Sequence, residues 1–287
     1  MGNHAVLTPQ SDILFACCKE KTIVKEHLIS EHVLAHIYSG SVSIAEAGKT
    51  HTFGEGDTLF LRKNLLAKFI NYPSGNIPFT SAVILFKQDT LQGLYAGRKE
   101  LQTSNAGRQE KQAEKTISHP VRSFAKHPAL NSLFSSLLPY YELNYSLSEE
   151  LTALKFREAL LILRKIDTSA DEILFDFSDP GKIDLAAFMH KNYSFNIPVK
   201  KFAHLTGRSL ATFKRDFQKT FNTSPEKWIR QKRLERAHFL IVEKGKRPSE
   251  VYLEVGFENF SHFSFAFKKS FGYSPSKISL TLSANNI

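Results

Sequence analysis

The sequence predicts an α+β protein with several domains. A sandwich or barrel of short strands comes first, a pair of helices follows, and an all-α domain with two helix-turn-helix units completes the chain. Three observations predict this order: short β-branched and aromatic runs between turn residues, then leucines at helical spacing, then a repeated phenylalanine pattern. The chain has 287 residues, 42% of them hydrophobic, which is enough for two cores.

The N-terminal part is predicted to be the β-domain. Its strand-like segments are short and rich in β-branched or aromatic residues, and turns containing glycine, proline, asparagine or serine separate them. Many short strands joined by tight turns indicate a small sandwich or barrel. The predicted strands are residues 33–38, 42–45, 58–61, 68–70 and 81–86.

A polar stretch, residues 104–114, is predicted to be an exposed loop or a frayed helix. Residues from about 120 to 166 then show leucines at helical spacing, which predicts two antiparallel helices, the second capped by Ser148. The second helix carries a leucine stripe, which we define as Leu147, Leu151, Leu154 and Leu161. We predict that this stripe is a dimer contact, and packing within one chain is the alternative.

The acidic stretch 167–182 ends in Asp-Pro-Gly and is predicted to be a linker between a regulatory domain, 1–166, and a C-terminal domain, 183–287. The net charge of +10 lies entirely beyond this linker. Residues 183–287 contain 18 Lys and Arg against 8 Asp and Glu, whereas residues 1–182 contain 20 of each. Such asymmetry indicates a polyanion-binding domain attached to a neutral one.

The C-terminal domain contains an internal repeat at an offset of 50 residues. Six identities in thirteen positions are too many for chance, and two copies are too few for a solenoid, so we infer a duplicated supersecondary unit. The matching residues are Phe213, Phe217, Lys219, Phe221, Ser224 and Pro225 in the first copy, and Phe263, Phe267, Lys269, Phe271, Ser274 and Pro275 in the second.

Each copy has the sequence form of a helix-turn-helix. Gly207 and Gly256 supply left-handed turns, and Ser209 and Asn259 can cap the helices that follow. Helical spacing predicts that Leu210, Phe213, Phe217 and Phe221 face inward in the first copy, and Phe260, Phe263, Phe267 and Phe271 in the second. The outward residues are Arg208, Thr212, Arg215 and Lys219, with Ala211 and Lys214 at the margins, and Ser261, His262, Phe265 and Lys269.

A connecting helix is predicted from Pro225 to about Lys244, with Ser224 as its cap. Twenty residues span about 30 Å, close to the ~34 Å between successive major-groove segments on one face of DNA. One duplex could therefore meet both units without a second protomer. The helix is basic, as phosphate contact requires, through Lys227, Arg230, Lys232, Arg233 and Arg236.

These residues resemble the DNA-binding domain of the AraC/XylS family of bacterial transcription regulators. The resembling strings are RSLATFKRDFQKTFNTSP, KRLERAHFLI and VGFENFSHFSFAFKKSFGYSP. The resemblance implies double-stranded DNA as the partner, RNA polymerase as a further one, and recognition helices that begin near Ser209 and Asn259. By position, it implies base reading by Ala211, Thr212, Lys214 and Arg215, and by Asn259, Ser261, His262 and Phe265.

Phe265 departs from the family pattern, because many members carry arginine there. A phenylalanine cannot hydrogen-bond a base edge, although it can contact a thymine methyl group or turn into the core. We therefore expect the first recognition helix, through Arg215, to discriminate more than the second. The full set predicted to bind DNA is Arg208, Ser209, Ala211, Thr212, Lys214, Arg215, Lys219, Asn259, Ser261, His262, Phe265 and Lys269.

The N-terminal part resembles the cupin-like β-barrel regulatory domains of the same family through IYSGSVSIAEAGKTHTFGEGDTLFLRKN. This resemblance implies either a small-molecule pocket inside the barrel or a surface for a regulatory protein. Metal-binding cupins use a His-x-His pair with Glu and a distant His, and Glu31, His32, His36 and His51 lack that spacing. We predict no metal and no cofactor.

The sequence contains no nucleotide-binding, zinc-protease or serine-hydrolase motif, so no enzymatic activity is predicted. The alternatives are a cupin-type enzyme with a basic accessory domain, and an interaction protein on which an anti-activator protein docks. The apolar run at residues 82–86 is too short for a membrane helix. The adjacent Cys17 and Cys18 fit a reducing compartment, and we expect a cytoplasmic protein without a membrane partner.

Overall fold

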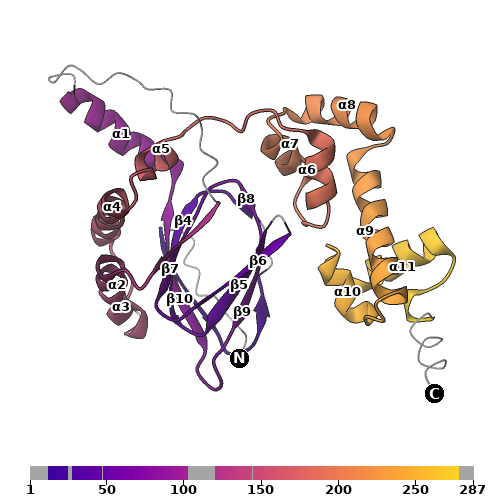
Figure 1. Ribbon diagram of the computed structural model, residues 1–287, viewed down its shortest axis with the longest axis horizontal. Helices are drawn as coiled ribbons and strands as arrows, with labels where there is room; N and C mark the ends of the chain where they lie inside the picture. Colours follow the sequence, from indigo (N-terminus) through magenta and orange to yellow (C-terminus); the bar gives the residue numbers. More distant parts are fainter. Residues whose placement is uncertain (1–11, 25–27, 47, 103–119, 144, 278–287) are drawn as a thin grey trace. The chain divides into compact units, whose positions relative to one another are not determined.

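The computed structural model describes residues 12–24, 28–46, 48–102, 120–143 and 145–277 (Figure 1). The predicted loop at residues 104–114 lies outside them. The chain divides into two compact units, Met1–Ser178 and Asp179–Ile287. No described helix combines the length and the apolar character that crossing a membrane requires.

The first unit contains antiparallel strands in three sheets. The largest sheet has the order β1-β10-β4-β7-β11, the second β2-β9-β5-β6, and the third pairs β3 with β8. The strands are β1 (Ile13–Cys18), β2 (Thr22–Ile23), β3 (Leu28–Ile29), β4 (His32–Ser39), β5 (Ser41–Glu46), β6 (Lys49–Gly54), β7 (Asp57–Leu61), β8 (Leu65–Leu66), β9 (Lys68–Tyr72), β10 (Phe79–Phe86) and β11 (Val121–Ala125).

The predicted order of a strand-rich part followed by an all-α part is confirmed, but the closed barrel is wrong. Among the described residues, no ladder joins the five-stranded sheet to the four-stranded one. The tight turn at Gly40, between β4 and β5, carries the chain from the first sheet to the second. Strands β2 and β3 pair over only two residues each, which is too short to bridge the sheets into a cylinder.

The five-stranded sheet is buried on both faces, because alternate residues of its strands enter two different cores. Val33 and Ile37 of β4 enter the core that faces the four-stranded sheet, whereas Leu34 between them enters a core shared with helices. Ala82, Ile84 and Phe86 of β10 also enter the helical core. Burial on both faces explains the unbroken apolar run at residues 82–86.

Five helices complete the described part of the first unit: α1 (Gln88–Gln102), α2 (Pro128–Ser135), α3 (Leu138–Glu142), α4 (Glu149–Ile166) and α5 (Ala170–Leu174). Helix α4 begins where predicted, since Ser148 Oγ accepts a hydrogen bond from Leu151 N at 3.2 Å. Its buried side includes Phe156, Leu160 and Leu163. The leucine stripe is divided, because Leu147 packs on the core while Leu154 and Leu161 are 62% and 61% exposed.

Much of the predicted linker is part of the first unit. Helix α5 lies within it and buries Ala170, Ile173 and Leu174 in the helical core. After α5, Lys63 Nζ donates to the carbonyl of Asp176 at 2.6 Å. The rings of Phe175 and Phe177 pack near Tyr95 of α1, with centroid distances of 5.4 and 6.1 Å. The chain is therefore held to the first unit as far as residue 177.

The second unit is all-α in its described part, with α6 (Leu185–Asn192), α7 (Val199–Leu205), α8 (Leu210–Phe221), α9 (Pro225–Val242), α10 (Pro248–Glu254) and α11 (Phe260–Phe271). The repeated phenylalanines form its two cores: Phe213 and Phe217 of α8 and Phe263 and Phe267 of α11 are fully buried. The predicted inward position is wrong for Leu210 and holds only in part for Phe260. Each is the first residue of its helix, and the two are 39% and 36% exposed, although the Phe260 ring still contacts those of Tyr252 and Phe263.

Candidate nucleic-acid interface

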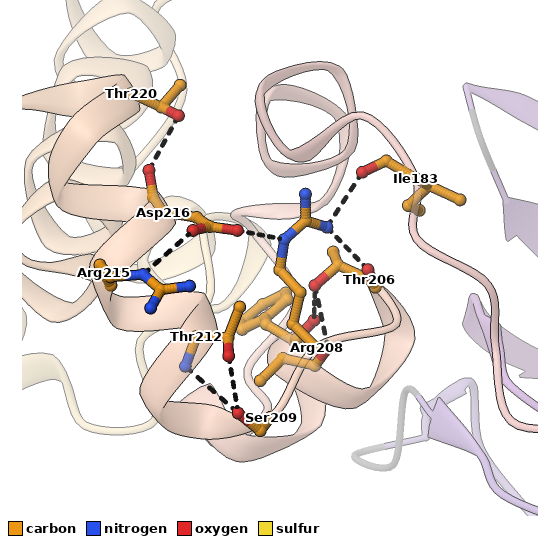
Figure 2. A network of polar contacts seen from close by, with 10 residues as sticks. Ile183, Thr206, Arg208, Ser209, Thr212, Arg215, Asp216 and Thr220 are labelled. Atoms are coloured by element: carbon orange, nitrogen blue, oxygen red, sulfur yellow. Dashed lines mark hydrogen bonds and ion pairs between the residues drawn. The ribbon is translucent and has the colours of Figure 1, made fainter.

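Helix α8 begins with a side-chain cap that fixes its first turn. Ser209 Oγ accepts from Thr212 N at 3.2 Å and lies 3.0 Å from Thr212 Oγ1 (Figure 2). At the other end, Asn222 adopts a left-handed conformation with φ of 53°, which terminates the helix. Contacts within a few residues therefore fix both ends of α8, and the helix presents a defined outer face.

The outer face of α8 carries most of the residues predicted for its first reading set. Ser209, Ala211, Lys214, Arg215 and Lys219 are exposed, whereas Thr212 is half-buried beside the cap. The Arg215 side chain is 67% exposed, and its Nε lies 3.7 Å from Asp216 Oδ1. A pair this loose on the surface contributes little to stability, so the guanidinium is available to a partner.

Arg208 differs from the rest of the predicted set, because its guanidinium is occupied within the protein. Its side chain is 11% exposed, and Nε donates to Asp216 Oδ2 at 3.1 Å. Its Nη1 donates to the carbonyls of Ile183 at 3.0 Å and Thr206 at 2.7 Å (Figure 2). The hydrogen bond from Arg208 keeps the pKa of Asp216 below its usual value, so the pair stays ionised at neutral pH.

Helix α11 repeats the design of α8 with a different cap. Asn259 Oδ1 accepts from Ser261 N at 2.8 Å and from His262 N at 3.1 Å. Asn259, Ser261, His262 and Lys269 are exposed. Phe265 is 70% exposed, so the alternative in which this side chain packs in the core is wrong.

The two reading sets are joined by α9, whose 18 residues span about 27 Å. Its Lys227, Arg230 and Arg236 are exposed, and Lys232 Nζ donates to Glu235 Oε2 at 2.8 Å. A cleft of about 450 Å³ lies where α9 meets the turn before α11. Its lining includes Glu226 and Arg230 of α9 together with Asn259 and His262 of the second reading set.

Arg233 is not one of the surface charges that the sequence predicts for α9. It is half-buried, and its guanidinium donates to backbone carbonyls of Tyr193, Phe195 and Gly256 at 2.8–3.0 Å. Charge and helical spacing alone do not distinguish it from its exposed neighbours. The one available signal is its position immediately before Leu234, at the edge of the buried side of α9.

His32 and His36 of the first unit are packing residues. Burial lowers the pKa of His36 to about 4 and that of His32 to about 3, so both are neutral at physiological pH. His36 Nδ1 lies 2.8 Å from Thr58 Oγ1, and its ring stacks on Phe134. Within the described ranges, no three His, Cys, Asp or Glu residues are grouped as metal ligands.

Comparison with known proteins gives two family matches. A profile described as the ExsA N-terminal regulatory domain matches residues 32–174, and a helix-turn-helix domain profile matches residues 202–279. The first match covers strands β4 to β11 and helices α1 to α5, and the second covers most of both helix-turn-helix copies. Together they account for both units of the chain.

Two relatives match along most of their length. The thermoregulatory protein LcrF of Yersinia pestis is 26% identical over 272 residues, which cover 90% of this chain and 92% of LcrF. The transcriptional activator VirF of the virulence regulon of Yersinia enterocolitica is 26% identical over 264 residues, with the same coverage. Among solved structures, an apo form of a ToxT variant from Vibrio cholerae has a TM-score of 0.45 at 14% identity and covers 94% of this chain and 98% of ToxT.

Proposed function

Because the chain belongs to the AraC/XylS family of transcription regulators, we propose that it reads two successive major-groove segments of one DNA duplex with α8 and α11. The observation that carries this proposal is the duplicated design of the second unit. Each copy buries its phenylalanines and exposes a capped helix with polar and basic side chains. The connecting helix spans about 27 Å, and a helix-turn-helix unit adds to this length at each end. The two recognition helices can therefore reach major-groove segments ~34 Å apart.

We assign base reading in the first groove to the exposed side chains of α8. Arg215 is the main discriminating residue, because an arginine can donate two hydrogen bonds to one guanine. Ala211, Thr212 and Lys214 flank it, and Lys219 is placed for a phosphate. Ser209 supplies the cap, and Arg208 acts indirectly by holding the start of the helix.

In the second groove, Asn259, Ser261, His262 and Phe265 of α11 form the reading set, and Lys269 is placed for a phosphate. The exposure of Phe265 supports an apolar contact with a thymine methyl group, since no protein core covers the ring. The exposed Lys227, Arg230 and Arg236 of α9 supply backbone contacts between the two grooves.

The first unit is proposed to receive the regulatory signal, with the functional boundary between residues 178 and 182. The space between its two larger sheets is filled by buried apolar side chains, including Ile37, Ile44, Leu59 and Phe69. This packing favours a regulatory protein on the outer surface over a small molecule between the sheets. We propose no catalytic activity, an action on cytoplasmic DNA, and RNA polymerase as the partner through which transcription changes.

We also propose that Leu154 and Leu161 of α4 contact a second copy of the chain. They lie seven residues apart on one side of the helix, and both are more than half exposed. The double variant L154E/L161E is expected to be monomeric where the wild type is dimeric, as measured by sedimentation. L253E, at an exposed leucine of the second unit, is the control. A wild-type chain that is already monomeric at micromolar concentration would contradict this assignment.

The experiment that tests the function is genome-wide mapping of bound DNA in the native cell, with and without the candidate signal. The full chain is expected to occupy discrete sites next to promoters whose transcription changes when the gene is deleted. A chain truncated to residues 1–178 is expected to occupy none. Uniform coverage of DNA by the full chain would show that binding is not sequence-specific and would contradict the proposal.

A further inference from the structure

Arg233 connects three segments of the second unit from the middle of α9. Its Nε donates to the carbonyl of Tyr193 at 3.0 Å and its Nη2 to that of Phe195 at 2.8 Å. Both carbonyls belong to the loop between α6 and α7, which leads into the first helix-turn-helix copy. Nη1 donates to the carbonyl of Gly256 at 2.8 Å, in the turn before α11, and lies 3.5 Å from Asn196 Oδ1. One side chain therefore joins the loop that leads into the first copy to the turn within the second.

The second copy also touches this loop directly. Gly256 has a φ of +96°, and a Cβ placed on it would lie 2.5 Å from the carbonyl oxygen of Ser194 and 2.9 Å from Arg233 Nε. The backbone of the second copy thus lies against that loop, with the guanidinium beside both. A second link spans the same joint, since Asn196 Nδ2 donates to Glu258 Oε1 at 2.6 Å.

The joint lies next to the start of the second recognition helix. Gly256 is three residues before Asn259, the cap of α11. Partial burial lowers the pKa of Arg233 to about 10, which leaves it charged at neutral pH, so the carbonyls replace part of the water around a half-buried cation. The planar guanidinium of an arginine can donate hydrogen bonds to several carbonyls at fixed angles, whereas the ammonium group of a lysine is a single point charge.

From this geometry we propose that Arg233 is a positioning residue that fixes the distance between the two recognition helices, and so determines which spacing of the two DNA segments the protein accepts. This inference rests on the proposed reading of two grooves. The guanidinium acts through protein backbone and contacts no base. If the joint loosens, α11 can follow a mis-spaced segment, and discrimination between spacings falls while general attraction to DNA persists.

The test uses the full chain and a duplex that the wild-type chain itself selects from a random pool. One base pair is inserted or deleted between the two contacted segments, and affinity is measured by fluorescence anisotropy. Wild type is expected to bind the altered duplexes about 10-fold or more weakly. The ratio of affinities for the selected and the altered duplexes is the spacing ratio. R233K is expected to reduce the spacing ratio to about 3-fold or less, with affinity for unrelated duplex unchanged. R247K, at an exposed arginine just before α10 whose side chain makes no cap hydrogen bond, is the control and should keep the wild-type ratio.

N196A provides a second variant in case R233K does not unfold cooperatively. It removes the Asn196 contacts to Arg233 and Glu258 from a half-buried position and is expected to lower the spacing ratio in the same direction. A folded R233K, or N196A if R233K fails to fold, with the wild-type spacing ratio would overturn the role of Arg233. If wild type itself tolerates every spacing, the reading of two grooves fails, and this inference fails with it.

Discussion

Raising the salt concentration from about 50 to about 200 mM is expected to weaken duplex binding by the C-terminal unit, residues 179–287, by about a thousandfold or more. Residues 183–287 hold the whole net charge of +10. Exposed lysines and arginines of α8, α9 and α11 provide six or more sites for phosphates. Each neutralised phosphate releases counterions, so the slope of log K against log salt is expected to be about −5 or steeper. Fluorescence anisotropy with a labelled duplex measures it.

The matched control is the first unit, residues 1–178. Residues 1–182 contain equal numbers of basic and acidic side chains, so this fragment is expected to show no measurable binding at either salt concentration. A shallow slope for the C-terminal fragment, about −1, would mean that its positive charge is not placed against the phosphate backbone. In that case the charge asymmetry of the chain would need another explanation.

Replacing Arg215 by alanine is expected to lower affinity for the selected duplex by about 1–3 kcal/mol, which corresponds to roughly 5- to 150-fold. The side chain is 67% exposed and only loosely paired with Asp216, so the loss reflects DNA contact and not unfolding. Preference at one base pair should relax, because only the bidentate donor is removed. Binding of the variant to duplexes with each base pair at every position identifies that pair.

R215K is the second variant to test, because it keeps the positive charge and loses the bidentate guanidinium. It is expected to retain affinity for unrelated duplex and to lose the preference at the same base pair. If R215A instead weakens binding to all duplexes equally, and R215K restores it, Arg215 contacts a phosphate. That outcome would remove Arg215 from the reading set while leaving the two-groove proposal intact.

The sequence predicts the second unit well because its signals are local. Phenylalanines four residues apart, a capping Ser209 or Asn259 and a turn glycine each act within one or two helical turns. The caps of α4, α8 and α9 bond as predicted. Leu210 and Phe260 show the limit of helical spacing, which gives the direction of a side chain but not where the core ends.

The features that the sequence could not predict depend on contacts between distant segments. Whether strands close into a barrel depends on ladders between sheets, and no residue pattern within one strand records that. Arg233 has the same sequence signal as Arg230 and Arg236, and only the approach of two remote loops makes it a donor to backbone carbonyls within the protein. The segment of helix α5 resembles a linker in sequence, because its acidic residues outweigh in composition the three apolar side chains that enter the core.

The turn glycines of the two copies lie against different neighbouring segments. Gly207 admits the backbone of Pro180 and Gly181, since a Cβ there would lie 2.5 Å from their carbonyl oxygens. Gly256 admits the carbonyl of Ser194, in the loop before α7, instead. A Cβ at either glycine would therefore displace a different neighbour, which makes the two turns unequal although both require glycine.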